Sequence, residues 1–420
     1  MTTATLHRAP VVVPVTRPPI LDGAVAVVDG VIAAVGPFED LLRVHPHVAV
    51  AEWTGALLPG LVNAHTHLQY TSFETVGAVS YPHYEAWSER FVVEYDSRPD
   101  EDWAAAARLG VEAGIRSGTT CFGDVVTDVG ALGTLVEAGV SGVSYFELIG
   151  VDRWAWATGV EAQLGEVIEM AAETPTAHVG VSPHAPYSVD EPVLRASADL
   201  ARMLGRRIHV HLAESDTEDA YYRTGTGALA ERVTARVGRP WSILADGGAG
   251  VGAAEFAQAC GLLGPDSHVA HGVYLGSEGR RLLREAGTYV ALCPRSNATV
   301  GVDPPPVADF LAEDSPIAVG TDSLGSSPSL DLMADVALLR DLARQGGYRN
   351  DDLDRRLLRA ATLGGAAALG LEHSVGSLDV GKRADLAIFE VEIDRSGIER
   401  AVSTEAAGAC TVTIVAGGVR

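Results

Sequence analysis

Lysine is almost absent from this chain of 420 residues. Lys382 is the only lysine among 31 basic residues, and 55 acidic residues give a formal net charge of −24. Binding to nucleic-acid phosphates or to an anionic membrane needs a basic surface. The charge balance therefore excludes nucleic acid and membrane as expected partners, although it says little about the fold.

Cysteines and long apolar runs are also scarce. The four cysteines lie far apart and form no metal-type cluster, so we expect free thiols in a reducing compartment. The first residues, "MTTATLHRAPVVVPVTRPPI", contain only a short apolar run broken by prolines, which does not fit a signal peptide. No apolar stretch is long enough to span a bilayer. These absences predict a cytoplasmic protein.

The two chain ends are both rich in strand-like segments. Ala24–Gly36 is β-branched and is interrupted by Asp29-Gly30, which is a strong hairpin signal. The C-terminal runs "VGSLDVGKRADLAIFEVE" and "CTVTIVAGGVR" have the same character. Neither end alone has enough strands to bury a core. We therefore expect residues 1–57 and 374–420 to form one small β-sandwich domain.

Residues 58–373 alternate between strand-like and helix-like segments. Helices are expected over 102–117, 193–204, 277–286 and 330–344. The strand candidates between such helices are "GLVNAHTHL", "TTCFGDVV", "GVSYFELIG", "HVGVSPHAPYS", "RIHVHLAES", "HVAHGVYL", "YVALCPRSN" and "IAVGTDSLG". This alternation predicts an α/β fold, a (β/α)₈ TIM-like barrel, whose chemistry would lie at the C-terminal ends of the strands.

Polar residues end several of these candidate strands. Each one alone has an ordinary explanation as a satisfied buried group, a helix cap or a solvated carboxylate. The barrel, however, would bring all of them to one mouth, where imidazoles and a carboxylate suit a divalent ion such as zinc. A purely structural origin for the whole set is therefore disfavoured. The residues are His65, His67, His184, His209, His211, Glu214, His271 and Asp322.

The motifs "PGLVNAHTH", "HVHLAES", "AHGVYL", "CPRSN" and "VGTDS" resemble the amidohydrolase superfamily. The chain is most similar to the branch with adenosine, S-adenosylhomocysteine and aminodeoxyfutalosine deaminases and triazine chlorohydrolases. The resemblance implies one catalytic divalent metal, zinc or in some relatives iron, held by His65, His67, His211 and Asp322. The fourth candidate strand has no lysine, which excludes a lysine-bridged pair of metals.

The resemblance also implies roles in a hydrolytic deamination. A catalytic metal lowers the pKa of its bound water, so that a nucleophile is available near neutral pH. Glu214 would protonate the ring nitrogen beside the attacked carbon. Asp322 would take the proton of the water and pass it to the departing ammonia, and His271 would stabilise the developing charge. The expected activity is deamination of an adenine-type nucleoside.

Candidate substrate contacts lie near these residues. By similarity, His184 would touch the substrate, Gln69 the base, Glu94 the ribose hydroxyls and Arg153 a substrate carboxylate. Trp87 lies in the aromatic segment after the first histidines and would form part of an apolar lid. A packed amide, helix packing and exposed charge remain open explanations for these residues.

The substrate that the resemblance favours is aminodeoxyfutalosine, an intermediate of menaquinone biosynthesis. S-adenosylhomocysteine, methylthioadenosine and adenosine are the alternatives among adenine nucleosides. Guanine, triazine and cyclic-amide hydrolysis are alternatives on the same metal, and a scaffold without metal is an alternative of another class. Such scaffolds typically lose metal ligands, whereas the expected ligands are all present here. The expected partner is thus a small-molecule nucleoside, and a homo-oligomer is compatible with the sequence.

Overall fold

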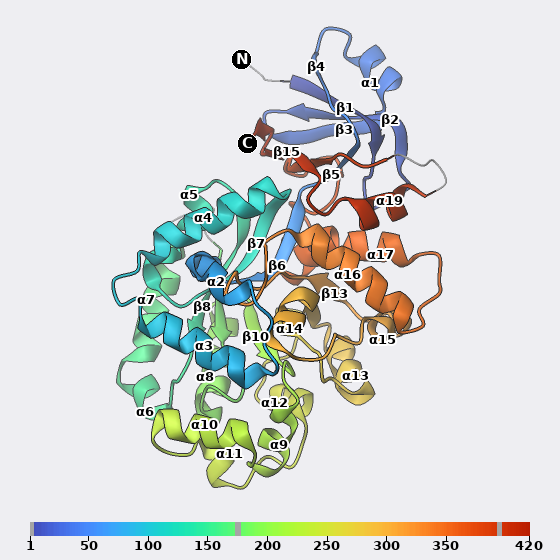
Figure 1. Ribbon diagram of the computed structural model, residues 1–420. Helices are drawn as coiled ribbons and strands as arrows, with labels where there is room; N and C mark the ends of the chain where they lie inside the picture. Colours follow the sequence, from blue (N-terminus) through green and yellow to red (C-terminus); the bar gives the residue numbers. More distant parts are fainter. Residues whose placement is uncertain (1–3, 173–177, 393–396) are drawn as a thin grey trace.

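The computed structural model describes residues 4–172, 178–392 and 397–420. Eight parallel strands form a nearly closed barrel, and a second, mixed sheet is built from the two ends of the chain (Figure 1). The blue and red parts of the chain lie together in Figure 1, although they are farthest apart in sequence. The predicted fold class is confirmed.

Each barrel strand pairs in parallel with the next strand along the chain. A seam is left between the first and the last, and it is bridged by side chains. Asn63 donates to the Thr321 hydroxyl at 2.7 Å and accepts from the Thr321 N–H at 3.1 Å, and the Asp322 N–H donates to the His65 carbonyl at 3.0 Å. The strands are β6 (Leu61–Thr66), β7 (Thr119–Val126), β8 (Ser141–Leu148), β9 (Val179–Pro183), β10 (Ile208–Leu212), β11 (Ser267–His271), β12 (Tyr289–Leu292) and β13 (Ile317–Val319).

The helices follow the expected alternation with the strands. The predicted helix over 277–286 is found with the same bounds, and Asp102 caps the predicted helix over 102–117 by accepting from the Ala105 N–H at 2.8 Å. The longer helices are α3 (Tyr84–Asp96), α4 (Trp103–Arg116), α7 (Glu161–Ala172), α8 (Glu191–Met203), α9 (Thr217–Thr224), α10 (Ala228–Val237), α13 (Ser277–Ala286), α16 (Leu332–Gln345) and α19 (Ile398–Glu405). The shorter helices are α1 (Phe38–Val44), α2 (Glu74–Gly77), α5 (Thr134–Glu137), α6 (Arg153–Ala155), α11 (Ser242–Ala245), α12 (Ala253–Ala259), α14 (Pro294–Val300), α15 (Val307–Ala312), α17 (Leu353–Arg359) and α18 (Gly365–Ala368). Within the described ranges, no helix has both the length and the apolar character that crossing a membrane requires.

The second sheet joins strands from both chain ends. β5 pairs in parallel with β1 and antiparallel with β14, so the N-terminal and C-terminal segments share one hydrogen-bonded ladder. The expected hairpin at Asp29-Gly30 joins β2 to β3, and both turn residues have positive φ (48° and 80°), as a type I′ turn requires. Gly60 separates this sheet from the barrel. The strands are β1 (Ala4–Val12), β2 (Ile20–Val28), β3 (Val31–Pro37), β4 (Ala49–Glu52), β5 (Ala56–Pro59), β14 (Leu386–Phe389), β15 (Cys410–Val415) and β16 (Gly418–Val419).

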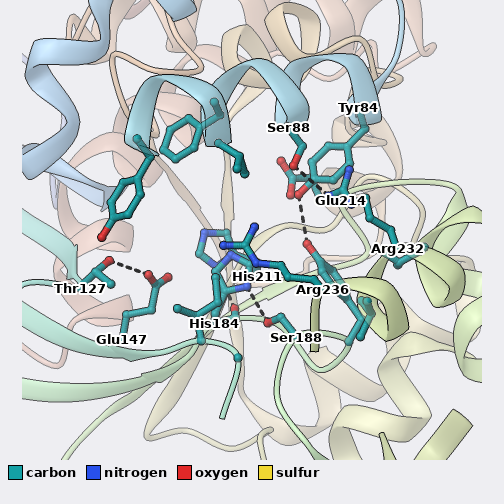
Figure 2. Close-up of a pocket in the computed structure, with 18 of the residues that line it drawn as sticks. Tyr84, Ser88, Thr127, Glu147, His184, Ser188, His211, Glu214, Arg232 and Arg236 are labelled. Carbon is teal, nitrogen blue, oxygen red and sulfur yellow. Dashed lines mark hydrogen bonds between the residues drawn. The ribbon is translucent and has the colours of Figure 1, made fainter. Parts of the chain in front are cut away.

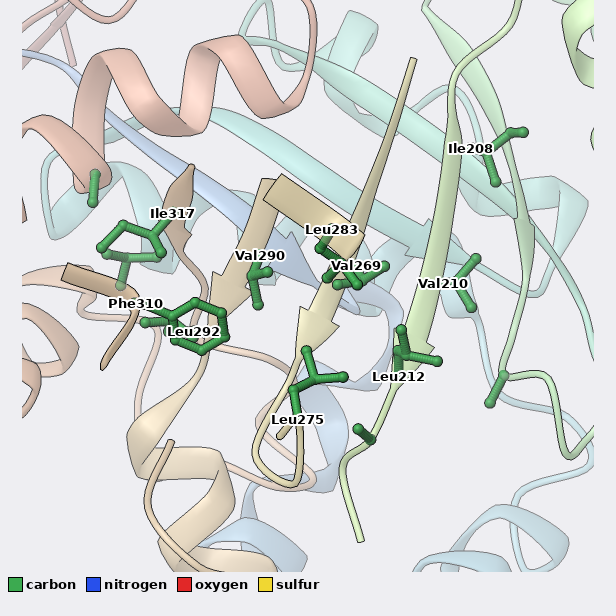
Figure 3. Packing of buried hydrophobic residues seen from close by; sticks show 14 of the residues in the cluster. Ile208, Val210, Leu212, Val269, Leu275, Leu283, Val290, Leu292, Phe310 and Ile317 are labelled. Atoms are coloured by element: carbon green, nitrogen blue, oxygen red, sulfur yellow. The ribbon is translucent and has the colours of Figure 1, made fainter. Parts of the chain in front are cut away.

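Strand β10 shows how the barrel sequence separates core from site. Ile208, Val210 and Leu212 are fully buried in the main apolar cluster, where Figure 3 shows them among residues of the neighbouring strands and helices. His209 and His211 alternate with them and therefore point to the opposite face, toward the barrel axis. The two-residue period thus buries an apolar layer outside the barrel and places imidazoles inside it.

Candidate active site

Strand β6 brings His65 and His67 to the inner face of the barrel, where both are buried. His65 uses Nδ1 to contact His209 Nε2 at 3.0 Å, and its Nε2 has no hydrogen-bond partner among the described residues. His67 Nε2 lies 3.1 Å from His211 Nε2. The ring nitrogens of strands β6 and β10 therefore converge on one point.

Hydrogen bonds orient the other members of this cluster. His211 Nδ1 lies 2.8 Å from the His184 carbonyl oxygen, which therefore accepts from Nδ1 and leaves Nε2 free. Asp322 Oδ2 accepts from the hydroxyls of Ser296 and Ser326, both at 2.7 Å. Asp322 Oδ1 lies 3.5 Å from His65 Nε2 and 3.6 Å from His67 Nε2. One carboxylate oxygen therefore faces the imidazoles.

The protonation states of these groups suit a metal ion. Burial lowers the pKa of His67 to about 3 and lowers the pKa of His65 and of His211, so all three rings are neutral. Burial alone would raise the pKa of Asp322, but the bond and the charge interactions with His65 and His67 hold it well below its usual range. Neutral imidazoles with a carboxylate are a donor set for zinc and similar ions. The ligating atoms of His65, His67 and His211 lie within 4.8 Å of one another, so these residues fit a divalent ion.

Backbone strain is concentrated at the same strand ends. Ala213, His271 and Asp322 all have positive φ, of 52°, 72° and 60°. Non-glycine residues adopt this left-handed region at a cost, and they are enriched at functional sites. At this site the conformation turns the chain sharply after β10, β11 and β13, immediately where polar side chains enter the pocket.

Glu214 and His271 form a second pair beside the cluster. His271 Nε2 lies 3.6 Å from Glu214 Oε1, while His271 Nδ1 contacts Asn297 Oδ1 at 3.1 Å. Burial raises the pKa of Glu214 to about 7, and the nearby His271 opposes that rise. A carboxyl group with this pKa exchanges a proton near neutral pH, which is the property of a general acid–base catalyst.

A pocket of about 290 Å³ opens above these residues (Figure 2). Its walls include Trp87 and Phe91 from α3 and Leu229 and Val233 from α10. Arg232 of α10 donates to the Ser88 hydroxyl of α3 at 2.8 Å, which links the two helices above the site. The pocket therefore combines an apolar, partly aromatic wall with a polar floor, as small-molecule sites do.

The structure brings two of the five expected substrate contacts to this pocket. His184 and Trp87 line it, whereas the other three lie outside its described lining. Gln69 accepts from the backbone N–H of Thr127 at 3.0 Å and so fixes a loop. Glu94 accepts from Arg90 and Arg98 at 2.7 and 2.6 Å, and Arg153 is exposed at the start of α6. The metal-type cluster, Glu214 and His271 all meet as expected.

Sequence reasoning missed four residues that line the pocket: Thr127, Glu147, Arg232 and Arg236. Glu147 carried a signal, because it ends a candidate strand as the histidines do. Arg232 and Arg236 are four apart on α10 and therefore share a helix face. No pattern in the sequence indicated that this helix covers the barrel mouth.

The family profile of the amidohydrolase family matches residues 56–420, and the bacterial imidazolonepropionase-like composite domain matches residues 23–47. The chain belongs to the amidohydrolase family. This match confirms the resemblance and the hydrolase class predicted from the motifs. The amidohydrolase match also includes the strands that the C-terminal end contributes to the second sheet.

Curated relatives of this amidohydrolase are named as nucleoside deaminases. It is 31% identical over 392 residues to the 5-methylthioadenosine/S-adenosylhomocysteine deaminase of Moorella thermoacetica, covering 90% of this chain and 84% of that protein. It is 29% identical over 356 residues to the aminodeoxyfutalosine deaminase of Deinococcus radiodurans, covering 83% of this chain and 81% of that protein. The solved adenosine deaminase of Xanthomonas campestris, with bound zinc, superposes with a TM-score of 0.79 at 26% identity, covering 99% and 92% of the two chains.

Proposed function

We propose that this amidohydrolase is a metal-dependent deaminase of an adenine-type nucleoside, replacing the 6-amino group by oxygen with release of ammonia. The observation that carries the proposal is the pairing of a buried histidine–aspartate cluster with Glu214, a carboxyl group whose pKa is raised to about 7 by burial. Plain amide hydrolysis does not need a second acid beside the metal, whereas a purine ring nitrogen must be protonated. The names of the relatives support the same class.

His65, His67, His211 and Asp322 would hold one divalent ion, zinc in the first place and iron as the alternative. When bound, the ion supplies Lewis-acid activation and lowers the pKa of water. Lys382, the only lysine, donates to Ser377 Oγ at 2.6 Å and to the Val375 carbonyl at 3.1 Å, so it is engaged in the C-terminal segment. A single ion therefore suits this donor set.

The remaining steps belong to side chains of the chain itself. Asp322 accepts a proton from the attacking water and delivers it to the departing amine. Glu214, neutral at and below about pH 7, donates a proton to the ring nitrogen next to C6. His271 faces Glu214 and stabilises the negative charge that develops during attack. Water and nucleoside thereby give the 6-oxo nucleoside and ammonia.

We further infer that the nucleoside carries an acidic 5′ substituent, with aminodeoxyfutalosine as the first choice and S-adenosylhomocysteine as the second. Arg232 and Arg236 line the pocket and take the role expected of Arg153. Guanidinium groups bind carboxylates through paired hydrogen bonds. The aromatic residues Trp87 and Phe91 of α3 favour the aromatic carboxylate of aminodeoxyfutalosine over an amino-acid tail.

A panel of nucleosides tests this proposal through the release of ammonia. We expect kcat/KM to be highest for aminodeoxyfutalosine, lower for S-adenosylhomocysteine, and lower again for methylthioadenosine and adenosine. Arg236→Gln should reduce kcat/KM about 10-fold or more for the two acidic substrates, the size of a lost charged hydrogen bond, and leave methylthioadenosine unaffected. Faster turnover of guanine, triazines or cyclic amides would contradict the proposed class.

A further inference from the structure

Glu147 is a buried carboxylate in the pocket that the proposed chemistry does not use. It lies in β8, one residue before the strand ends, and is only 7% exposed. Its Oε2 accepts from the Thr127 hydroxyl at 2.7 Å, while its Oε1 has no hydrogen-bond partner among the described residues. Leaving a buried carboxylate oxygen unpaired costs stability. Such an oxygen in a pocket wall indicates a ligand that donates a hydrogen bond.

A chain of hydrogen bonds holds this carboxylate in place. The Thr127 hydroxyl lies 3.2 Å from the Tyr70 hydroxyl, so Tyr70 can donate to Thr127 while Thr127 donates to Glu147. Gln69 fixes the backbone of Thr127 through its N–H at 3.0 Å. The segment that follows the first two histidines therefore prepares an acceptor on the neighbouring strands, and a pre-organised acceptor binds its donor at little entropic cost.

The order of residues around the pocket indicates which part of the substrate reaches Glu147. Glu147, His184 and Glu214 belong to the ends of the consecutive strands β8, β9 and β10, and Figure 2 shows Glu147 and Glu214 on opposite sides of His184 and His211. A purine with C6 at the metal-type cluster and N1 at Glu214 presents N3 next around its ring. The sugar on N9 follows N3.

We propose that Glu147, held by Thr127, binds a ribose hydroxyl of the nucleoside. The proposal rests on the proposed function, because that function places C6 and N1. A sugar hydroxyl is a donor and matches the free acceptor Oε1. Glu94, which the sequence suggested for this role, is already occupied by Arg90 and Arg98.

Paired substrates test the proposal in the metal-loaded, full-length protein. Adenosine is compared with 2′-deoxyadenosine and 3′-deoxyadenosine for the wild type, Glu147→Gln and Glu147→Ala. We expect the wild type to prefer adenosine over at least one deoxynucleoside by about 10- to 100-fold in kcat/KM, the size of a hydrogen bond to a charged group. Glu147→Ala should abolish this preference through a higher KM for adenosine, with the metal content unchanged. Thr127→Val should weaken it, and Glu112→Gln, on the exposed face of α4, should leave it intact.

An equal loss for ribose and deoxyribose substrates in Glu147→Ala would overturn the proposal, because it would assign Glu147 to the base or the metal. A preference abolished by Glu94→Gln in place of Glu147→Gln would overturn it as well. Calorimetric binding of inosine and 2′-deoxyinosine separates the two proposals. Binding that depends on the hydroxyl and on Glu147 without any deamination would refute the deaminase and retain the sugar site. Absence of both binding and deamination would refute both.

Discussion

At the residue scale, Glu214 carries the sharpest prediction. Glu214→Gln keeps the shape of the side chain but removes the acid, so turnover should fall about 10²- to 10⁴-fold while metal content stays the same. Because burial raises the pKa of Glu214 to about 7, the group is protonated below that pH and ionised above it. The wild-type kcat/KM should therefore decline as pH rises through about 7.

A pH–rate profile of both proteins, with metal analysis, checks this expectation. The residual activity of Glu214→Gln should lose the decline on the basic side, because the amide does not ionise. Near-normal deamination by Glu214→Gln would contradict the assigned role. A decline that persists unchanged in the variant would assign the titration to another group.

The residues that the sequence predicted and those it missed differ in a physical way. His65, His67, His211 and Asp322 are recognisable because each ends a strand in a motif whose polarity conflicts with burial. Arg232, by contrast, lies in an amphipathic helix where an arginine is unremarkable, and only the fold brings it over the site. Glu94 and Arg153 illustrate the reverse error of inference, since neighbouring charges and solvent account for them.

At the scale of elements, strand and helix periodicity predicted most of the barrel. The expected helix over 330–344 is found at Leu332–Gln345 and the one over 193–204 at Glu191–Met203, so only the ends differ. What periodicity does not encode is where a helix sits on the barrel. Helix α3 lies over the mouth because Trp87 Nε1 donates to the Gly325 carbonyl at 2.8 Å, in the loop after β13 that also carries Asp322.

This bond between α3 and the loop gives a prediction for the lid. Trp87→Phe keeps an aromatic wall but removes the donor, which is worth about 1 kcal/mol for an ordinary hydrogen bond. We expect KM to rise about 5-fold, with kcat and metal content nearly unchanged, in steady-state kinetics on the preferred nucleoside. Trp154→Phe is the matched control, since Trp154 is 68% exposed and lies outside the described pocket lining. A fall in kcat without a change in KM would mean that the tie serves Asp322 and not the lid.

At the scale of the whole molecule, the site and the closure of the barrel depend on the same seam. Strands β6 and β13 are not joined by a regular ladder, and Asn63 and Thr321 bridge them with two buried hydrogen bonds. His65 and His67 come from one side of this seam and Asp322 from the other, so an ion held by all three would also join the two strands. Binding of a ligand to the folded state alone stabilises that state.

Asn63→Ala should therefore weaken both the fold and the metal site. Removing the amide leaves the Thr321 N–H and hydroxyl without their partner, which should lower the free energy of unfolding by about 2–3 kcal/mol. Chemical denaturation of metal-loaded and chelator-treated protein measures this, with exposed Asn350→Ala as the matched control. Chelation should lower the melting temperature of the wild type reversibly, and Asn63→Ala should bind added zinc more weakly. A variant that loses stability but binds zinc with unchanged affinity would show that the ion does not depend on closure of the seam.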